Sequence, residues 1–589
     1  MDYRHKLLIN VLDRLRDTAP SHYRSYHDKD YNGVQRARSK TLIHLFLLVK
    51  FGESDFETRH SFITDGPDDG GVDAYYFDER HKTLYLIQSK FRENNASRRG
   101  ISAEELIKME IGAILRGSPT YQDRMGNDRE FNEKIKQLQE KWSKLPDQAR
   151  YKYKIVVLGG QPKYNDQQIR RLLDLGENEP FEFYSYERIY EEILFPFCAS
   201  NFYDPDEIVI ELNLQNKEQS VLRQTVTTQQ GEFQVRVVFV PVEEIGRVLS
   251  QYKNAILKYN PRNYLSLSRN SVNQAIREGI LNSKKNDFAV YNNGITMLCS
   301  EFMISETTGR QNRGQIILEK PQIINGGQTA YVLSEIYEDA SKRHSLKGKE
   351  VLLKAIVIPS DLKEESVRKF IEGVSNATNQ QSKVEEADRR SNDEILITIQ
   401  KRIFQEFGYL LERKRGEFYT AIEQGYVDKD QVVDRVGLLR SYLAFQGNPS
   451  EARRSGKDRL FRDKRFKEIV GIGDDYKAML FAALILMRLR KERKDSAWGN
   501  GLRYGKFAIV AAVKYLVPEA DRISPENLEN LVSVAIKRAK EKWSKFETWI
   551  QHQKRNIDYK RPDGFDFDNY YKGKTLNQDI RDFFGNLRT

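Results

Sequence analysis

The spacing of apolar residues changes twice along the chain, and each change predicts a new region. Up to about residue 52 the apolar positions recur at helical spacing, as Leu42, Leu45 and Val49 illustrate. Short runs rich in β-branched and aromatic residues then alternate with helical stretches, which is typical of a mixed α/β domain. The expected strands are GVDAYYFD, KTLYLIQSKF, YKIVVLGG and FEFYSYE, and the expected helices lie around residues 103–115 and 128–145. We expect this first domain to cover residues 1–204.

A second α/β region is expected at residues 205–388. Its strand candidates are FQVRVVFVPV, DFAVYNNGITML, GQIILEKPQIIN and EVLLKAIVIP, with a helix around residues 242–258. Helical patterns dominate from residue 389 to residue 589, and no tandem repeat or low-complexity linker is evident. The pattern therefore predicts an α/β multidomain protein with a mostly helical, basic C-terminal region.

Composition narrows the class of protein. Hydrophobic residues make up 39% and charged residues 31% of the chain, a balance that favours packed cores beneath a charged surface. The net charge of +11 suits an anionic polymer as partner, because neutralising phosphates releases condensed counterions.

The apolar run at residues 478–487 is about half as long as a bilayer requires, and the N-terminus lacks the uninterrupted apolar core of a secretory signal. We expect a cytoplasmic protein without a membrane segment. Cys198 and Cys299 are too few for a zinc knuckle or a disulfide framework.

The strongest chemical signal lies in ITDGPDDGGVDAYYFDERHKTLYLIQSKF. Asp73 starts one expected strand, while Gln88 and Lys90 stand near the end of the next. Antiparallel pairing would bring these two ends together, and alternation places Gln88 and Lys90 on one face with Ser89 on the other. The segment therefore predicts a small polar site at one end of a hairpin, with Asp73, Gln88 and Lys90 as its catalytic residues.

These residue types suit the hydrolysis of a phosphodiester. That reaction uses a divalent ion to polarise the phosphoryl oxygens and activate water, together with a cation that offsets developing charge. Asp73 can bind Mg²⁺ or Mn²⁺, Lys90 can stabilise negative charge, and Gln88 can offer only a neutral carbonyl oxygen.

A neutral Gln leaves a magnesium site short of one carboxylate, so a further acid is expected. The candidates are Asp65, Asp69 and Glu57; Asp65 is preferred over Asp69, and the choice between Asp65 and Glu57 stays open. His60 and His81 lie near the motif, but a lone histidine is more often a structural or surface residue than a ligand. The alternative interpretation is that Asp73 caps a turn while Gln88 and Lys90 are ordinary strand residues.

The ITDG…GVDA…IQSK pattern resembles the Mrr-like branch of the PD-(D/E)XK nucleases, in which Gln replaces the second carboxylate. FAVYNNGITML, PQIINGGQTAYVLSEIY, GVSNATNQQSKVEEADRRSND and GYLLERKRGEFY resemble the abortive-infection phage-resistance (AIPR) family. The combined resemblance spans roughly residues 55–419. It implies a bacterial antiviral protein with a restriction-endonuclease-like N-terminal domain.

The leading hypothesis is a metal-dependent endonuclease that cleaves DNA and is regulated by the central domain. The alternatives are an RNase, and a nucleic-acid or nucleotide sensor whose nuclease-like domain is inactive.

The phrase IINGGQTAYVLSEIY reads as a strand, a glycine turn and the start of a helix, a geometry that favours an anion. It resembles a segment of the ParB and sulfiredoxin-like group, except that Gln328 and Thr329 stand where a His–Arg pair would neutralise a phosphate. Asn325, Gly326, Gly327, Gln328 and Thr329 are therefore candidates for nucleotide or phosphate binding. The competing interpretation is a buried amide network of Asn292, Asn293, Asn325, Gln328, Asn376, Asn379 and Gln380.

Basic segments near the C-terminus are candidates for contact with a nucleic-acid backbone. Their named residues are Arg413, Lys414, Arg415, Arg462, Lys464 and Arg465, with Trp543 and Tyr571 available for stacking on bases. Solvated helix faces explain most such runs of charge. We expect nucleic acid, DNA in the first place, as the partner, and the sequence leaves a nucleotide ligand and a homo-oligomer open.

Overall fold

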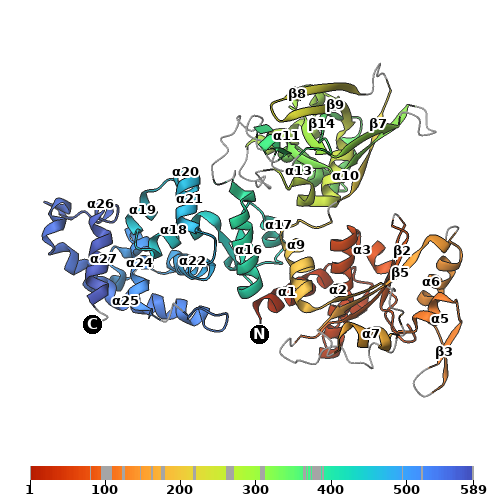
Figure 1. Cartoon of the computed structure of the whole chain (residues 1–589), viewed down its shortest axis with the longest axis horizontal. Coiled ribbons are helices and arrows are strands. Elements are labelled where there is room, and N and C mark those ends of the chain that lie inside the picture. The colour runs from red at the N-terminus through yellow and green to blue at the C-terminus, as the bar shows by residue number, and fades with distance from the viewer. Residues whose placement is uncertain are drawn as a thin grey trace.

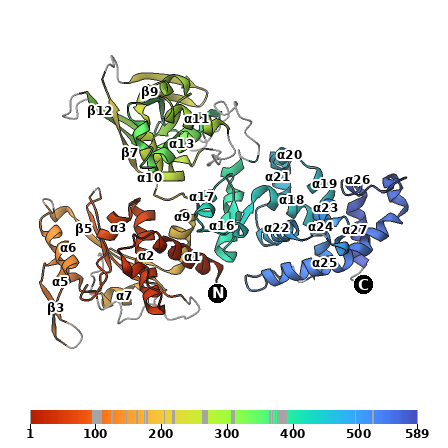
Figure 2. The same cartoon turned by 180° about the vertical axis from the view of Figure 1, so that it is seen from behind.

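The computed structural model describes residues 2–586 apart from some internal segments. Those segments are 80, 94–108, 123–125, 146–147, 161–163, 174, 176–179, 204, 216–220, 261–270, 306–311, 363–365, 368, 372, 375–386, 388–389, 494 and 519–521. Figure 1 shows three groups of elements, with the N-terminal region on one side, the C-terminal helices on the other and the central region above the junction. In Figure 1 and in the view from behind in Figure 2, α16 (Glu394–Phe407) lies between the N-terminal region and the C-terminal helices.

The N-terminal region is built on a four-stranded mixed sheet of order β1-β2-β5-β6. Its strands are β1 (Ala74–Asp78), β2 (Thr83–Lys90), β5 (Lys152–Gly159) and β6 (Phe181–Tyr184). β1 and β2 pair antiparallel, whereas β2, β5 and β6 run parallel. All four expected strands are present, and the prediction of a mixed α/β region is confirmed.

Side chains at alternate positions of these strands pack into two separate hydrophobic cores. Ala74, Ile87 and Val156 face α1 (Tyr3–Asp17) and α2 (Tyr31–Phe51). Tyr75, Leu86 and Ile155 face the opposite side, where α5 (Ile111–Leu115) and α6 (Glu133–Ser143) pack. The sheet is therefore covered on both faces, as a largely parallel sheet requires. The remaining elements of this region are α3 (Phe56–Ser61), β3 (Thr120–Gln122), β4 (Asp128–Glu130), α7 (Asp166–Leu172), α8 (Tyr186–Ile189) and α9 (Phe195–Cys198).

The core beneath α1 and α2 also contains residues from far beyond position 204. These are Phe404, Leu410, Phe418, Ala421, Tyr426 and Val427, all buried in the same cluster as Leu8, Leu45 and Val156. The N-terminal core thus extends across the boundary that the sequence pattern suggests.

The central region contains a five-stranded sheet of order β13-β10-β14-β9-β8 and a three-stranded sheet of order β11-β12-β7. α10 (Val242–Tyr252) and α13 (Gly327–Glu338) pack against each other and against the same core as the larger sheet. The strands are β7 (Glu207–Asn213), β8 (Leu222–Thr228), β9 (Gly231–Pro241), β10 (Ile295–Cys299), β11 (Glu301–Ser305), β12 (Arg313–Glu319), β13 (Gln322–Asn325) and β14 (Glu350–Val357). The other helices are α11 (Ser271–Leu281) and α12 (Phe288–Tyr291).

Helices dominate after residue 390, as expected, with one short parallel pair, β15 (Leu410–Glu412) and β16 (Val432–Asp434). The apolar run at 478–487 lies in α22, whose residues from Met479 to Leu486 are buried. The helices are α17 (Tyr419–Glu423), α18 (Arg435–Phe445), α19 (Pro449–Arg454), α20 (Lys457–Phe461), α21 (Asp463–Val470), α22 (Tyr476–Lys491), α23 (Gly501–Tyr504), α24 (Lys506–Leu516), α25 (Leu528–Gln551), α26 (Phe567–Tyr570) and α27 (Thr575–Gly585). A small hairpin of β17 (Lys560–Arg561) and β18 (Gly564–Phe565) precedes α26.

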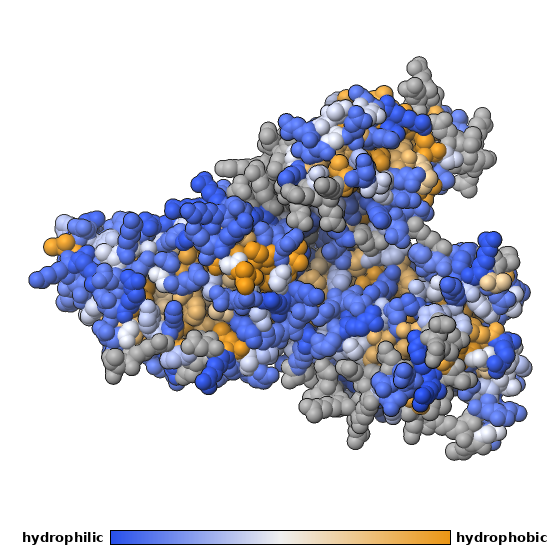
Figure 3. Space-filling view, in the orientation of Figure 1, coloured by the Kyte–Doolittle hydropathy of each residue, from blue (hydrophilic) through white to orange (hydrophobic). Residues whose placement is uncertain are grey.

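Within the described part of the chain, none of these helices combines the length and the apolar character that crossing a membrane demands. Both cysteines are buried, and neither forms a disulfide. Most of the surface visible in Figure 3 is hydrophilic, with smaller hydrophobic patches on each region. This agrees with the balance of charged and apolar residues in the sequence.

Candidate functional site

The loop between α3 and β1 is held tightly against the start of β1. The carbonyl oxygen of Asp73 accepts hydrogen bonds from the backbone nitrogens of Thr64 and Asp65, at 2.9 and 3.0 Å. The loop turns back through Asp68, Gly70 and Gly71, which have φ values of 58°, 59° and 74°. A side chain at Gly70 would place its Cβ 2.5 Å from the Phe131 ring, so close packing also requires this glycine. The backbone therefore fixes Asp65 beside Asp73.

Asn132 clamps the same loop from the other side. Its side-chain Oδ1 accepts from Ile135 N and caps α6, while its Nδ2 donates to the carbonyl oxygens of Thr64 and Pro67. Its backbone nitrogen donates to Asp68 O at 3.0 Å. One residue thus starts a helix and positions the acidic loop, a role that the sequence analysis missed although Asn is a common N-cap.

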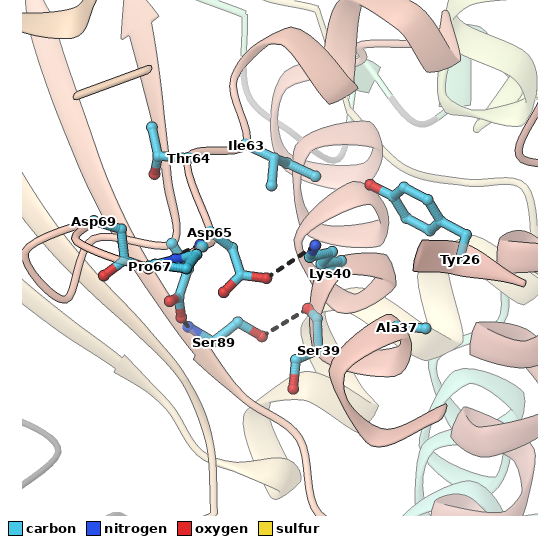
Figure 4. A network of polar contacts seen from close by, with 12 residues as sticks. Tyr26, Ala37, Ser39, Lys40, Ile63, Thr64, Asp65, Pro67, Asp69 and Ser89 are labelled. Atoms are coloured by element: carbon cyan, nitrogen blue, oxygen red, sulfur yellow. Dashed lines mark hydrogen bonds and ion pairs between the residues drawn. The ribbon is translucent and has the colours of Figure 1, made fainter. Parts of the chain in front are cut away.

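Three carboxylates converge at this point. One oxygen from each of Asp65, Asp69 and Asp73 lies within 4.8 Å of the other two. Figure 4 shows Asp65 and Asp69 on the loop that faces the end of β2. Asp69 also accepts from Gly71 N and Gly66 N at 2.8 and 3.2 Å, which fixes its carboxylate. The structure therefore brings together the predicted ligand Asp73 and the candidates Asp65 and Asp69.

Burial dominates the electrostatics of this acidic cluster. Asp73 is only 4% exposed, and this burial raises its pKa to about 7, against the opposing effect of Lys90. The pKa of Asp69 is raised for the same reason. A cation would compensate these poorly solvated carboxylates, since buried charge requires a partner.

Gln88, Ser89 and Lys90 occupy the end of β2 as the alternation predicts. Lys90 Nζ lies 3.4 Å from Asp73 Oδ2, which also accepts from Ser89 N at 2.7 Å. Gln88 is buried, and its Nε2 donates to Gly71 O at 3.1 Å. Ser89 points the other way, and its Oγ donates to Ser39 O on α2 (Figure 4). The Lys90 side chain stays 33% exposed, and its acidic neighbours raise its pKa despite its partial burial.

Glu57 is a correction to the sequence-based ligand set. Its carboxylate accepts from the Tyr23 hydroxyl and lies 3.9 Å from His22 Nε2, outside the group formed by the three aspartates. Glu57 is exposed in the first turn of α3. His81 lies at the opposite end of the hairpin, 2.7 Å from Asp78, whereas His60 contacts Tyr26.

Two lysines near the acidic cluster were missed. Lys40 of α2 forms an ion pair with Asp65 at 3.2 Å (Figure 4), and Lys134 of α6 donates to Ile63 O at 2.6 Å. Neither lies in the hairpin, so no local pattern connects them to Asp73.

The glycine turn at Asn325–Thr329 has a packing explanation. Gly326 has a φ of 83° and a Cβ there would lie 2.8 Å from Gly294 O, while a Cβ at Gly327 would lie 2.8 Å from Asn260 Nδ2. Asn292 Nδ2 donates to Thr329 Oγ1 at 3.2 Å. Asn325 pairs with Thr296 in the sheet, and Gln328 is half-buried. These contacts favour the structural interpretation of the turn. Asn376, Asn379 and Gln380 lie outside the described residues.

The basic candidates divide into two groups. Arg415, Arg462 and Lys464 are exposed. Arg413 and Lys414 are a correction, because both face inward. Arg413 donates to Gln400, Glu417 and Ser391 O, and buried Lys414 donates to Lys258 O at 2.6 Å. Arg465 is already engaged by Glu451 and Glu468.

The expected stacking residues are also a correction. Trp543 is 0% and Tyr571 is 1% exposed, so neither ring can reach a base. Their polar atoms bond inside the helical core, where Trp543 Nε1 donates to the Tyr571 hydroxyl, which donates to Glu547. The aromatic residues in this basic region therefore stabilise its interior.

Comparison with known proteins identifies one family. The model of the AIPR family, described as AIPR protein, matches residues 257–559, just over half of the chain. No curated protein and no solved structure matches. The matched region covers most of the central region and most of the C-terminal helices, and it does not include the acidic cluster. The chain therefore belongs to the AIPR family, the abortive-infection phage-resistance proteins.

Proposed function

We propose that this protein is a metal-dependent endonuclease that cleaves DNA, with its catalytic centre at Asp65, Asp69, Asp73, Gln88 and Lys90. Membership of the AIPR family suggests an abortive-infection function against phage. The observation that carries the nuclease proposal is the convergence of three aspartates with Lys90 at one end of the β1–β2 hairpin. The family match lies elsewhere in the chain, so this part of the proposal rests on the geometry and on the motif.

The donor set fits a hard divalent cation. Carboxylate and amide oxygens are the ligands that Mg²⁺ and Mn²⁺ prefer. Oxygens bound to one Mg²⁺ lie about 2.9 Å apart when adjacent and about 4.2 Å apart when opposite. Three carboxylate oxygens within 4.8 Å of one another can therefore converge on one ion through small side-chain movements. Such an ion would polarise a phosphoryl oxygen and lower the pKa of an attacking water.

The protein's own groups supply the remaining chemistry. Lys90 is charged at neutral pH and partly exposed, so its ammonium can contact a phosphoryl oxygen while remaining near Asp73. Gln88 is held by Gly71 O through its amide nitrogen, which orients its side chain at the edge of the cluster. Asp73 is held by Ser89 N, so its carboxylate is positioned before any ligand arrives.

The test is a cleavage assay on the purified full chain with plasmid, linear duplex DNA, single-stranded DNA and RNA. Each substrate is incubated with Mg²⁺, Mn²⁺ or EDTA. We expect DNA cleavage with either metal and none with EDTA. Asp73→Asn and Lys90→Met should lower the rate by about 100-fold or more, since even outer partners of a metal site typically contribute about 10- to 100-fold.

Asp128→Asn, an exposed position on β4, is the matched control and should cut like the parent. Cleavage by Asp73→Asn at the parental rate would overturn the assignment. Cleavage of RNA alone would replace DNA as substrate. Nucleic-acid binding without any cleavage would favour a sensor with an inactive nuclease-like domain.

A further inference from the structure

Three hydrogen-bond donors from three different helices gather beside the acidic cluster. Lys40 comes from the middle of α2, His60 from α3 and Lys134 from the first turn of α6. Lys40 Nζ lies 3.2 Å from Asp65 Oδ2, and Lys134 Nζ lies 2.6 Å from Ile63 O. Ile63 and Asp65 are two residues apart in one loop, so the two ammonium groups approach it from opposite helices.

Lys134 holds its charge without a counter-ion of its own. Its acceptor is a neutral main-chain carbonyl, and no carboxylate of a described residue lies within 4.0 Å of its nitrogen. Burial and the neighbouring charge of Lys40 lower the pKa of Lys134, and the charge of Asp65 opposes them only in part. An ammonium placed in this way is destabilised until an anion arrives.

The single carboxylate of Asp65 cannot fully neutralise both Lys40 and a metal ion. Its carboxylate pairs with Lys40 and also belongs to the group of three aspartates. A metal bound by these aspartates would draw on the same carboxylate, which would leave Lys40 less neutralised. Both lysines, which are close enough for the charge of Lys40 to act on Lys134, would then carry unbalanced positive charge.

His60 adds a neutral donor whose tautomer follows from its partners. Arg59 Nε donates to His44 Nδ1 at 3.2 Å, so neutral His44 carries its proton on Nε2 and donates to the Tyr26 hydroxyl at 2.8 Å. Tyr26 must then donate to His60 Nδ1, at 3.0 Å. Burial and the charges of Lys134 and Lys40 lower the pKa of His60 to about 4. His60 is therefore neutral at pH 7 with its proton on Nε2.

We propose that Lys40, His60 and Lys134 form a phosphate-binding site for the phosphodiester backbone next to the bond that is cut. This inference rests on the proposed function. Two ammonium groups supply charge, and His60 Nε2 supplies a directional hydrogen bond, which together match the oxygens of a phosphate. The site recognises no base, so it accepts DNA and RNA backbones alike.

The test measures binding of a fluorescein-labelled DNA duplex and a labelled single-stranded RNA by anisotropy. Ca²⁺ replaces Mg²⁺, and affinity is followed from low to moderate salt. We expect Lys40→Ala and Lys134→Gln to weaken binding of the preferred polymer by about 3- to 10-fold and to lower the salt slope by about 0.9 each. Lys134→Gln removes the charge and keeps a polar, hydrogen-bonding side chain at this position.

The controls lie on the same helices. Lys50→Gln on α2 and Lys136→Gln on α6 should retain parental affinity and slope, because Lys50 pairs with Glu192 and Lys136 with Glu130 and Glu133. Lys134→Arg keeps the positive charge and should bind like the parent. His60→Phe should weaken binding without changing the slope, since a neutral donor releases no counterion.

The outcomes separate this inference from the proposed function. Parental affinity and slope in both Lys40→Ala and Lys134→Gln would overturn the phosphate site, whether or not the parent cleaves. Equal losses in the controls would also overturn it, because the effect would then be one of net charge. Weakened binding in these variants, with a parent that binds but never cleaves, would support the phosphate site while the nuclease proposal fails.

Discussion

Asp73 is the residue at which the local backbone and the electrostatics of the site meet. Its backbone pairs with β2 and with the acidic loop, and its carboxylate accepts from Ser89 N and lies near Lys90. Burial nevertheless raises its pKa to about 7, so the two neighbours compensate the lost hydration only in part. At the scale of single residues, the Asp73 carboxylate is only partly compensated, which is what the proposed metal site requires.

Gln88→Glu tests whether this site binds a metal ion. A carboxylate at position 88 would lose the bond that Nε2 donates to Gly71 O and would face a carbonyl oxygen in a buried position. We expect the metal-free variant to lose about 1–3 kcal/mol of unfolding free energy. Added Mg²⁺ should raise its Tm more than it raises that of the parent, as thermal unfolding can measure. Gln88→Ala is the control, and an equal metal-dependent rise in both variants would contradict the expectation.

The residues of this site differ in how far the sequence could predict them. Asp73, Gln88 and Lys90 follow from strand alternation and one tight connection, which are local properties. Asp65 and Asp69 were candidates, but only the folded loop separates them from Glu57. Lys40 and Lys134 come from helices whose positions depend on tertiary packing. Their sequence context resembles that of any exposed helical lysine.

Among the elements, each expected strand segment contains a strand, but β7, β8 and β11 were not expected, and the start of the expected strand DFAVYNNGITML forms the helix α12. Helix starts were also hard to predict. The stretch from residue 128 was expected to be helical, yet it begins as β4 and α6 starts only at Glu133. Asn132 decides the start, because its side chain caps the helix and also binds the acidic loop. Tertiary contacts thus override the local helical pattern before Asn132.

The glycine turn before α13 yields a prediction about stability. Gly326→Ala would place a Cβ 2.8 Å from Gly294 O at a φ of 83°, whereas Gly348→Ala meets nothing within 4 Å at a φ of 72°. The left-handed backbone alone costs about 1–2 kcal/mol, so we expect that loss at Gly348 and a loss larger by about 1–3 kcal/mol at Gly326. Urea denaturation compares the two variants. Equal losses would mean that the close approach to Gly294 is unimportant.

At the scale of the whole molecule, Lys414 joins the C-terminal helices to the central region. It is buried, and its Nζ donates to Leu257 O and Lys258 O. Burial lowers its pKa to about 7, with Glu417 opposing and Arg413 and Lys258 reinforcing the shift. The interface between the two regions therefore contains a lysine that sheds its proton easily.

This lysine should make stability depend on pH. Its unfolded pKa is about 10.4, so between about pH 7 and pH 10 the unfolded chain binds a proton that the folded chain releases. The unfolding free energy should rise with pH in that window, by at most about 1.4 kcal/mol per unit from this group. Lys414→Met should remove the rise, which urea midpoints at pH 7, 8 and 9 can follow. Exposed Lys347→Met is the control, and an unchanged slope in Lys414→Met would refute the assignment.

The N-terminal core that Phe404, Leu410 and Phe418 complete has a consequence for synthesis. When a ribosome has released residues 1–204, every side chain of the acidic cluster exists, but part of the apolar cover of α1 and α2 is still untranslated. At 5–20 residues per second, the missing segment up to Val427 follows roughly 10–45 s later. A product terminated early would carry Asp73 on an unfinished scaffold. The chain thus delays completion of its candidate catalytic domain until most of the polypeptide has been made.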